Sequence, residues 1–367
     1  MVLKQSKILQ VGGLFCLVVC VQVLTSLTET QFYLTQLTMS AYYTLLVIGL
    51  AVVMGYAGQI SIGHAGFFAI GGYLSASLTT HNLVELQEHA VIKLLSSLGM
   101  LVSGQDMYGE QLLVFAPWTA CILAVLVAAA IAFFLGIPVL KLKGHYLAMA
   151  TLGFGIIIFR IVLASEYFGE ADGISEVPGF MLLPAIGTLG PLSVSGDFGL
   201  RVQNYYVAWA MLCGGLWLLL NLIDSRVGRA LRAIHGSEEA AEAIGVNTAR
   251  FKLHVFVVSA IYAALAGVFL THYNGGIGPS EASVMKSVRY VALVAVGGMA
   301  NIWGTLVMGF VLTFLSLRGV FGSYDDAVFG VILILVMLFA PEGVLSIRGQ
   351  MFWARFRKRT GEKNVSL

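Results

Sequence analysis

Residues 36–78 read QLTMSAYYTLLVIGLAVVMGYAGQISIGHAGFFAIGGYLSASL and contain no Asp, Glu, Lys or Arg. The stretch is long enough for two helices that cross a bilayer, since each crossing needs roughly 20 residues at a rise of about 1.5 Å per residue. Glycines interrupt its centre at Gly55, Gly58 and Gly63. Because the apolar residues are continuous and do not alternate with polar ones, the pattern predicts membrane-spanning helices that are broken at the glycines.

The composition of the whole chain supports a membrane protein. Of its 367 residues, 58% are hydrophobic and 11% are charged, and the mean hydropathy is +0.88. A soluble domain carries about 25% charged residues, so a water-soluble protein is excluded for the chain as a whole. The net charge of +2 is too small to indicate a nucleic-acid partner.

Ten apolar runs recur along the chain and predict an all-α polytopic membrane protein with about ten transmembrane helices, some of them discontinuous. The candidate spans are residues 8–25, 36–56, 60–78, 113–136, 145–164, 203–223, 253–274, 288–300, 303–317 and 327–341.

The distribution of Lys and Arg predicts the orientation of these spans. With the N-terminus inside, fifteen Lys and Arg residues fall in inside segments and five in outside segments. Basic residues concentrate on the cytoplasmic side of membrane proteins. We therefore expect a multi-pass protein of the bacterial plasma (inner) membrane with both termini in the cytoplasm.

Two outside segments are long enough to carry structure. Within residues 79–112, apolar positions at helical spacing from Leu83 to Leu98 predict one amphipathic helix, capped by Asn82, that lies at the membrane interface or on the protein's own surface. Residues 165–202 are acidic and rich in Gly and Pro. Either a partner docks on this second segment or it is a solvated connection.

The cytoplasmic loop 224–252 carries the sharpest local pattern. Ser237 predicts a helix N-cap, and Gly245 can take the left-handed conformation that ends a helix. The loop therefore predicts a short, rigid helix with a small apolar surface, which suits insertion into a groove of another protein. The alternative is a basic inside loop that happens to be helical. The candidate coupling residues are Glu238, Glu239, Ala240, Ala241, Ile244 and Gly245.

The glycine-broken pattern occurs twice. Gly55 is followed by Gln59 and Ile60, and Gly297 is followed at the same spacing by Asn301 and Ile302. Broken spans in two halves of a transporter point toward a binding site or gate. The alternative explanation for the glycines is close helix packing through small residues. The alternative for His64 is a structural role as a hydrogen-bonded residue. The candidate pathway residues are Gln59, Ser61, His64 and Asn301.

Several motifs together resemble one family. Glu239-Ala240-Ala241 followed by Gly245 resembles the EAA loop by which permeases of ABC importers dock on their ATPase. Four further stretches resemble the M-type permease of branched-chain amino acid importers, and the likeness extends over residues 37–348. The stretches are GYAGQISIGHAGFFAIGGY (55–73), GHYLAMATLGF (144–154), ADGI (171–174) and APEGV (340–344). Glu170 and Ala171 depart from the family's usual glycines, and the later Leu-Pro part of the EAA motif is absent.

The resemblance implies a permease subunit that translocates branched-chain or other hydrophobic amino acids delivered by an external binding protein. It implies a second, homologous and non-identical permease and two ATPase subunits that bind ATP-Mg, with no cofactor on this chain. It also implies an N-terminal span and connection (1–36), a permease core (37–348) with the coupling loop 224–252, and a basic tail (349–367).

Alternatives remain open at this point. A urea or amide importer permease resembles this family too. An ion-coupled secondary transporter would need buried acidic residues, and the spans carry essentially none. No catalytic constellation, metal site or Gly-x4-Gly-Lys-Ser/Thr phosphate loop is visible in the sequence, so we expect neither an enzyme nor nucleotide binding by this chain.

Overall fold

The computed structural model describes residues 2–105, 109, 111–142, 144–183, 191–340 and 343. The α-helices are α1 (Val2–Leu27), α2 (Tyr33–Tyr56), α3 (His64–Thr80), α4 (Ala90–Ser97), α5 (Pro117–Val139), α6 (His145–Ala164), α7 (Arg201–Asp224), α8 (Arg226–Gly236), α9 (Glu238–Ala243), α10 (Thr248–Asn274), α11 (Val284–Gly297), α12 (Ile302–Leu317) and α13 (Asp325–Phe339). The strands are β1 (Leu101–Gln105), β2 (Gln111–Phe115), β3 (Ile174–Ser175), β4 (Phe180–Leu183), β5 (Leu192–Val194) and β6 (Gly276–Ile277).

Each of the ten predicted spans coincides with a helix, namely α1, α2, α3, α5, α6, α7 and α10 to α13. By length and composition, seven helices among the described residues are long and apolar enough to cross a membrane. The remaining three are shorter, with 17 residues in α3, 14 in α11 and 16 in α12. All three border a glycine break, which shortens the helices on either side of it.

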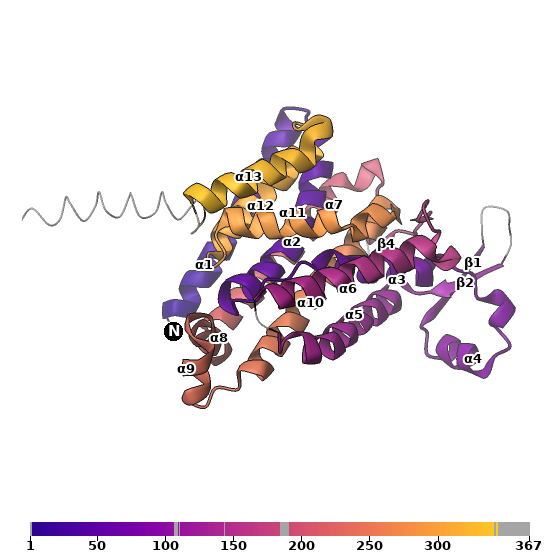
Figure 1. Ribbon diagram of the computed structural model, residues 1–367. Coiled ribbons are helices and arrows are strands. Elements are labelled where there is room, and N and C mark those ends of the chain that lie inside the picture. Colours follow the sequence, from indigo (N-terminus) through magenta and orange to yellow (C-terminus); the bar gives the residue numbers. More distant parts are fainter. Residues whose placement is uncertain are drawn as a thin grey trace, which may run out of the picture.

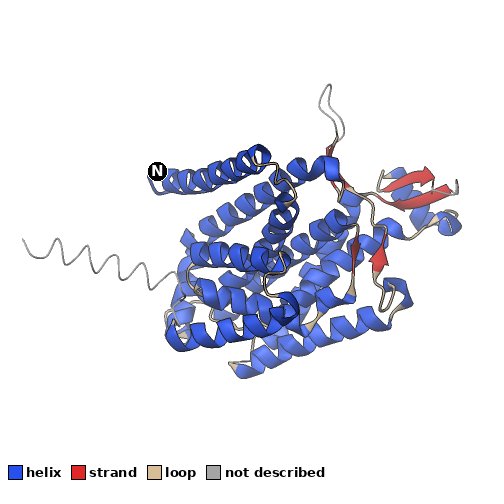
Figure 2. Cartoon of the chain, turned by 90° about the horizontal axis from the view of Figure 1, so that it is seen from above, coloured by secondary structure: helices blue, strands red, loops and turns tan. Residues whose placement is uncertain are grey.

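The two ends of the helix bundle carry different structures. Figure 1 shows α8, α9 and the N-terminus together at one end, and α4 with β1 and β2 at the other. Lys7 on α1 pairs with Asp224 at the end of α7 at 2.5 Å, which fixes the N-terminal helix beside the α8–α9 end. Viewed from above, the strands gather toward the opposite end (Figure 2). The predicted inside loop and the predicted outside segments thus lie at opposite ends.

The expectation of one amphipathic helix from Leu83 to Leu98 is confirmed only in its second half, as α4. A 3-10 turn, η1 (Val84–Leu86), precedes the short α4, and β1 and β2 then form an antiparallel hairpin. Asn82 does not cap a helix; its Oδ1 accepts from Val84 N at 3.1 Å, next to the turn η1, whose N-cap is Leu83. The same oxygen accepts from Leu113 N at 3.0 Å, so this side chain also fastens the hairpin to the turn.

The acidic segment 165–202 is anchored to the bundle. β3 pairs with β6, and β4 pairs with β5. The side chains of Ile174, Val177 and Phe180 are buried, and His272 Nδ1 lies 2.7 Å from the carbonyl oxygen of Pro178. The described part of the segment is therefore a packed cover over one end of α10 and not merely a solvated connection.

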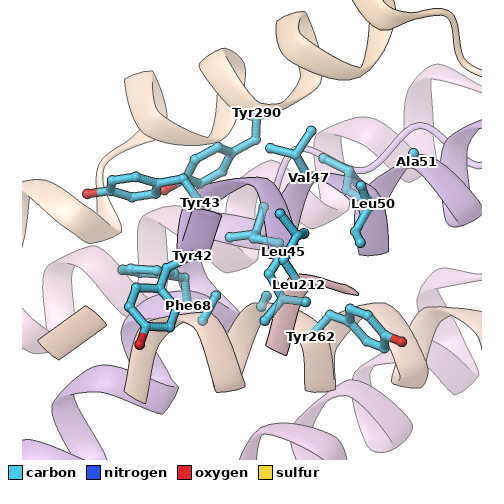
Figure 3. Close-up of a cluster of buried hydrophobic side chains, with 14 of the residues drawn as sticks. Tyr42, Tyr43, Leu45, Val47, Leu50, Ala51, Phe68, Leu212, Tyr262 and Tyr290 are labelled. Carbon is cyan, nitrogen blue, oxygen red and sulfur yellow. The ribbon is translucent and has the colours of Figure 1, made fainter. Parts of the chain in front are cut away.

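Helix α2 forms the centre of the core. It packs against α7, α10 and α12, and it lacks an exposed polar face. Figure 3 shows Tyr42, Leu45 and Leu50 of α2 surrounded by apolar side chains from other helices, including Tyr262 of α10. Because α2 runs into the first glycine break, that break is attached to the most deeply buried of the seven long apolar helices among the described residues.

Candidate functional site

The two glycine breaks meet in space. α2 ends at Tyr56 and α3 begins at His64, while α11 ends at Gly297 and α12 begins at Ile302. A Cβ atom built on Gly55 would lie 1.5 Å from the carbonyl oxygen of Met299, which places the two backbones in direct contact. The hydroxyl of Tyr56 donates to the carbonyl oxygen of Ala300 at 3.0 Å. The repeated sequence pattern thus marks one structural junction.

A third segment closes on the same junction. Gly298 and Gly343 both have a positive φ, at 97° and 95°. A Cβ atom on Gly343 would lie 2.4 Å from Gly298 Cα, so only glycine fits there without displacing the backbone. Gly343 belongs to the APEGV stretch, of which residues 341, 342 and 344 lie outside the described residues.

Ser61 and His64 belong to a buried hydrogen-bond chain. His64 Nδ1 lies 3.0 Å from Ser61 Oγ, and His64 Nε2 lies 2.8 Å from Ser259 Oγ on α10. Both candidate residues are 1% exposed. A histidine with partners on both ring nitrogens ties the first break to α10, which supports the structural alternative for this residue.

Gln59 has a different environment. It is 2% exposed, and neither Nε2 nor Oε1 of its side chain makes a hydrogen bond within the described part of the chain. A buried amide without a partner destabilises the protein by about 1–3 kcal/mol. Of the four candidate pathway residues, Gln59 is therefore the one whose side-chain polar atoms are all buried and without a partner among the described residues.

Asn301 has a local structural role. It is the N-cap of α12, because its Oδ1 accepts from Gly304 N at 3.1 Å. Asn301 and Gln59 share a position relative to a glycine in the sequence, but their side chains have different environments: Asn301 caps a helix, and the side chain of Gln59 has no hydrogen-bond partner in the part of the chain that the structure describes.

Replacing these two amides should therefore give opposite effects on stability. Gln59→Leu is expected to leave the thermal stability of the purified transporter unchanged or higher, by up to about 1–3 kcal/mol, and to reduce transport. Asn301→Leu is expected to destabilise the permease by about 1 kcal/mol because the cap is lost, whereas Asn301→Asp keeps the capping oxygen. Thermal unfolding and uptake are measured on the same preparations. A Gln59→Leu protein that no longer accumulates in the membrane would refute the assignment of Gln59.

The predicted short helix within the loop 224–252 is confirmed as α9. Ser237 caps it, since its Oγ accepts from Ala240 N at 3.2 Å. At its end Gly245 has a φ of 86°, with Gly245 N bonded to Glu242 O at 2.9 Å and Val246 N bonded to Ala241 O at 3.0 Å. These two bonds form the Schellman motif, in which a left-handed glycine satisfies the last carbonyls of a helix.

One side of α9 is fixed to the protein. Ala241 is buried, and the carboxylate of Glu238 pairs with the Lys252 ammonium at 2.5 Å. Thr248 donates to Glu242 Oε1 at 2.6 Å. These contacts hold α9 rigidly against the start of α10.

The other side of α9 is open. Glu239, Ala240 and Gly245 are exposed, and Ile244 is 76% exposed. The exposed apolar side chain of Ile244 lies at the end of a helix that is held rigidly. This arrangement is expected of a helix that inserts into a groove of a partner. Of the six candidate coupling residues, these four are placed for contact, while Glu238 and Ala241 mainly hold the helix in position.

The sequence analysis missed helix α8, which precedes α9. Ser225 caps it by accepting from Val227 N at 3.1 Å, and Leu231 and Ile234 are buried. The signal was present as a serine followed by apolar residues at helical spacing. A Cβ atom on Gly58 would lie 2.9 Å from His235 Nδ1, so α8 touches the first glycine break directly. The exposed side of α9 is therefore connected through α8 to the junction of the two glycine breaks.

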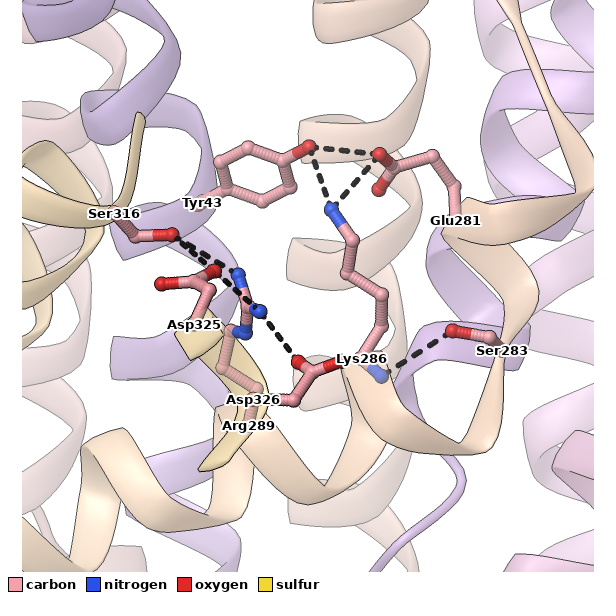
Figure 4. Close-up of polar contacts among 8 residues, drawn as sticks. All are labelled: Tyr43, Glu281, Ser283, Lys286, Arg289, Ser316, Asp325 and Asp326. Atoms are coloured by element: carbon pink, nitrogen blue, oxygen red, sulfur yellow. Dashed lines mark hydrogen bonds and ion pairs between the residues drawn. The ribbon is translucent and has the colours of Figure 1, made fainter. Parts of the chain in front are cut away.

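A cluster of charges lies near the end that carries the strands. Lys286 of α11 pairs with Glu281 of η4 (Pro279–Ala282) at 2.9 Å, and the hydroxyl of Tyr43 donates to the same carboxylate at 3.0 Å (Figure 4). Arg289 pairs with Asp325 and Asp326 at 2.6 Å each. Both cations lie on α11, where they neutralise neighbouring carboxylates.

Comparison with known proteins agrees with this arrangement. The family model described as "Branched-chain amino acid transport system / permease component" matches residues 32–337. The high-affinity branched-chain amino acid transport system permease protein LivM of Escherichia coli (strain K12) is 31% identical, over 84% of this chain and 68% of the relative. The LivM protein of Salmonella typhimurium is 30% identical, over 89% of this chain and 73% of the relative. The E. coli permease protein LivH is 26% identical, over 84% of this chain and 92% of the relative. No solved structure matches the chain.

The match covers both glycine breaks, the α8–α9 loop and every spanning helix after α1. It confirms the all-α polytopic fold and the assignment as a transport component and not an enzyme. The chain therefore belongs to the family of permease components of branched-chain amino acid transport systems, and it is a permease subunit of an ABC importer.

Proposed function

We propose that this permease translocates branched-chain amino acids by alternating access. Its relatives are named for branched-chain amino acid transport, which supports this substrate class. The observation that carries the mechanism is the direct contact between Gly58 in the first break and His235 of α8. Movement of the α8–α9 end is thereby transmitted to the junction where two broken spans meet, and there Gln59 supplies a buried amide without an internal partner.

The exposed side of α9 is the proposed docking surface for the ATPase subunit. Ile244 enters a groove of the ATPase, and Glu239 faces the groove's rim. The ATPase binds ATP-Mg and hydrolyses it, and α9 transmits the resulting movement because Lys252 and Thr248 hold it rigidly on α10.

The proposed assembly contains two ATPases, an external substrate-binding protein and a second permease. The chain is similar both to LivM and to LivH of E. coli, two different permease proteins, which supports a pair of non-identical permeases. The permease core extends over residues 37–348, with residues 1–36 as an added N-terminal span and residues 349–367, outside the described residues, as a basic tail.

The proposed membrane is the bacterial inner membrane, with the α8–α9 end in the cytoplasm. Reporter fusions after Leu142 and Gly236 are expected to report the cytoplasm, and a fusion at Gly104 in β1 is expected to report the outside. The charge distribution gives the reason, since cytoplasmic loops retain Lys and Arg. A cytoplasmic signal at Gly104 would contradict the orientation.

Substrate uptake tests the proposal directly. Proteoliposomes that contain the whole importer and its binding protein are expected to accumulate labelled leucine, isoleucine and valine only when ATP is enclosed with the ATPases. Transport of urea or short amides without leucine transport would replace the substrate and keep the transporter class. Leucine uptake that persists without ATP and follows an ion gradient would instead support the ion-coupled alternative.

A further inference from the structure

A groove lies between the end of α5 and the beginning of α10. Its volume is about 490 Å³, and it is close to α9, since Asn247 lines it and also caps α10. Its walls are apolar and include Phe133, Ile137 and Leu253. Phe133 is 44% exposed and Ile137 is 45% exposed, although both lie on a membrane-spanning helix. The groove therefore presents apolar surface at the level of the bilayer.

The mouth of this groove is basic. Lys141, Arg250 and His254 line it, and all three are exposed. No acidic side chain among the described residues lines the groove. Lys141 follows the last turn of α5 and Arg250 is in the first turn of α10, so the cations lie where two spanning helices leave the apolar layer.

Among the described residues, neither Lys141 nor Arg250 forms an ion pair. An apolar groove with such cations at a bilayer boundary complements one kind of molecule. The apolar wall suits an acyl chain. The side chains of Lys141 and Arg250 suit a phosphate. A water-soluble anion would leave the wall exposed. A zwitterionic phospholipid offers a phosphate but brings its own ammonium beside these cations, so its headgroup has no net charge to neutralise them. The charge and the polarity of the groove agree only for an anionic lipid.

We propose that this groove binds an anionic phospholipid of the leaflet on the α8–α9 side. The acyl chain lies against Phe133, Ile137 and Leu253, and the headgroup phosphate lies between Lys141 and Arg250. The proposal depends on the membrane location of the chain and not on its transported substrate. It places a lipid headgroup beside the cap of α10, directly next to the helix proposed to contact the ATPase.

The experiment measures lipid binding to the purified importer complex in detergent by native mass spectrometry. Phosphatidylglycerol is compared with phosphatidylcholine that carries the same acyl chains. The intact protein is expected to bind phosphatidylglycerol preferentially. Lys141→Gln or Arg250→Gln is expected to weaken that binding about fivefold each, and the double variant roughly 25-fold, because one cation near an anionic headgroup contributes about 1 kcal/mol.

Two control variants remove the same charge elsewhere. Arg226→Gln changes an exposed cation on α8 at the same end, and Lys93→Gln changes one on α4 at the other end; both should retain the lipid affinity of the unmodified complex. Equal binding of the two lipids, or equal loss in all four variants, would overturn the proposal. Weaker ATPase co-purification of Lys141→Gln and Arg250→Gln with unchanged lipid binding would also overturn it and assign the groove to the ATPase. Because no transport is measured, a wrong substrate assignment does not affect the result.

Discussion

Gly245→Val is expected to separate the permease from its ATPase while leaving it in the membrane. The φ of 86° at this position is strained for a β-branched residue by roughly 1–3 kcal/mol. A water-exposed helix of six residues has little stability of its own to absorb that strain. The affinity for the ATPase should therefore fall about tenfold or more. ATPase co-purification and substrate-stimulated ATP hydrolysis measure the loss.

Gly245→Asn provides the matched control. No atom of the described residues lies within 4 Å of a Cβ at this position, so a new side chain has space there and only the backbone conformation is tested. Asparagine tolerates the left-handed conformation far better than valine. Gly245→Asn should retain most of the coupling. Equal losses in both variants would mean that the glycine is needed for contact and not for its conformation.

Glu239→Lys tests the exposed face of α9 separately from its fold. Glu239 is exposed, whereas its neighbour Glu238 is paired with Lys252. A lysine at position 239 opposes the helix dipole and inverts a contact charge. If this variant and Gly245→Val both keep their ATPases and hydrolyse ATP at the normal stimulated rate, α9 is not the coupling helix.

Among the glycines that the structure describes, Gly55 is the one whose replacement by alanine is expected to be most damaging. The added Cβ would meet the carbonyl oxygen of Met299 at 1.5 Å and its carbonyl carbon at 2.3 Å. Both contacts are with backbone, so no flexible side chain can move away. Overpacking of this kind typically destabilises by about 1–3 kcal/mol, and here the two broken spans must separate as well. Lower abundance in the membrane and a lower unfolding temperature are the expected results.

Gly153→Ala provides the comparison for the same chemical change. Gly153 lies within α6, and nothing lies within 4 Å of a Cβ built there. Alanine is the better helix former, so this variant should be neutral or stabilising by roughly 0.5–1 kcal/mol. Similar behaviour of the two variants would contradict the contact between the two breaks.

The spanning helices were predictable because the hydrocarbon layer imposes a length and a polarity on each of them. Each predicted span coincides with a helix of the structure. The segments outside the spans were predicted less well, because water imposes no comparable rule. Residues 83–98 have helical spacing throughout, yet they form only the turn η1 and the short α4, and Asn82 bonds that turn to β2 and does not begin a continuous helix.

The candidate site was predictable where the signal was local. Ser237 and Gly245 set the ends of α9 by bonds to residues only a few positions away, so the sequence contained the whole argument. The pathway candidates depend on distant partners. Nothing near His64 in the sequence reveals Ser259, and nothing near Gly58 reveals His235. Gln59 and Asn301 share a sequence spacing, but only the structure separates the unpartnered amide from the helix cap.

The burial of α2 has a consequence for how the chain is made. Within its most apolar stretch 94% of residues are buried, against 11% in α1. Its neighbours α7, α10 and α12 are all translated later, and α12 ends at Leu317. At 5–20 residues per second, the roughly 260 residues between Tyr56 and Leu317 take about 13–50 s to synthesise. At the start of that interval α2 has none of these three helices, and until its end α2 lacks α12. A helix that ends in the protein interior must therefore first be acceptable to lipid, and residues 36–56 meet that requirement by carrying no charged side chain.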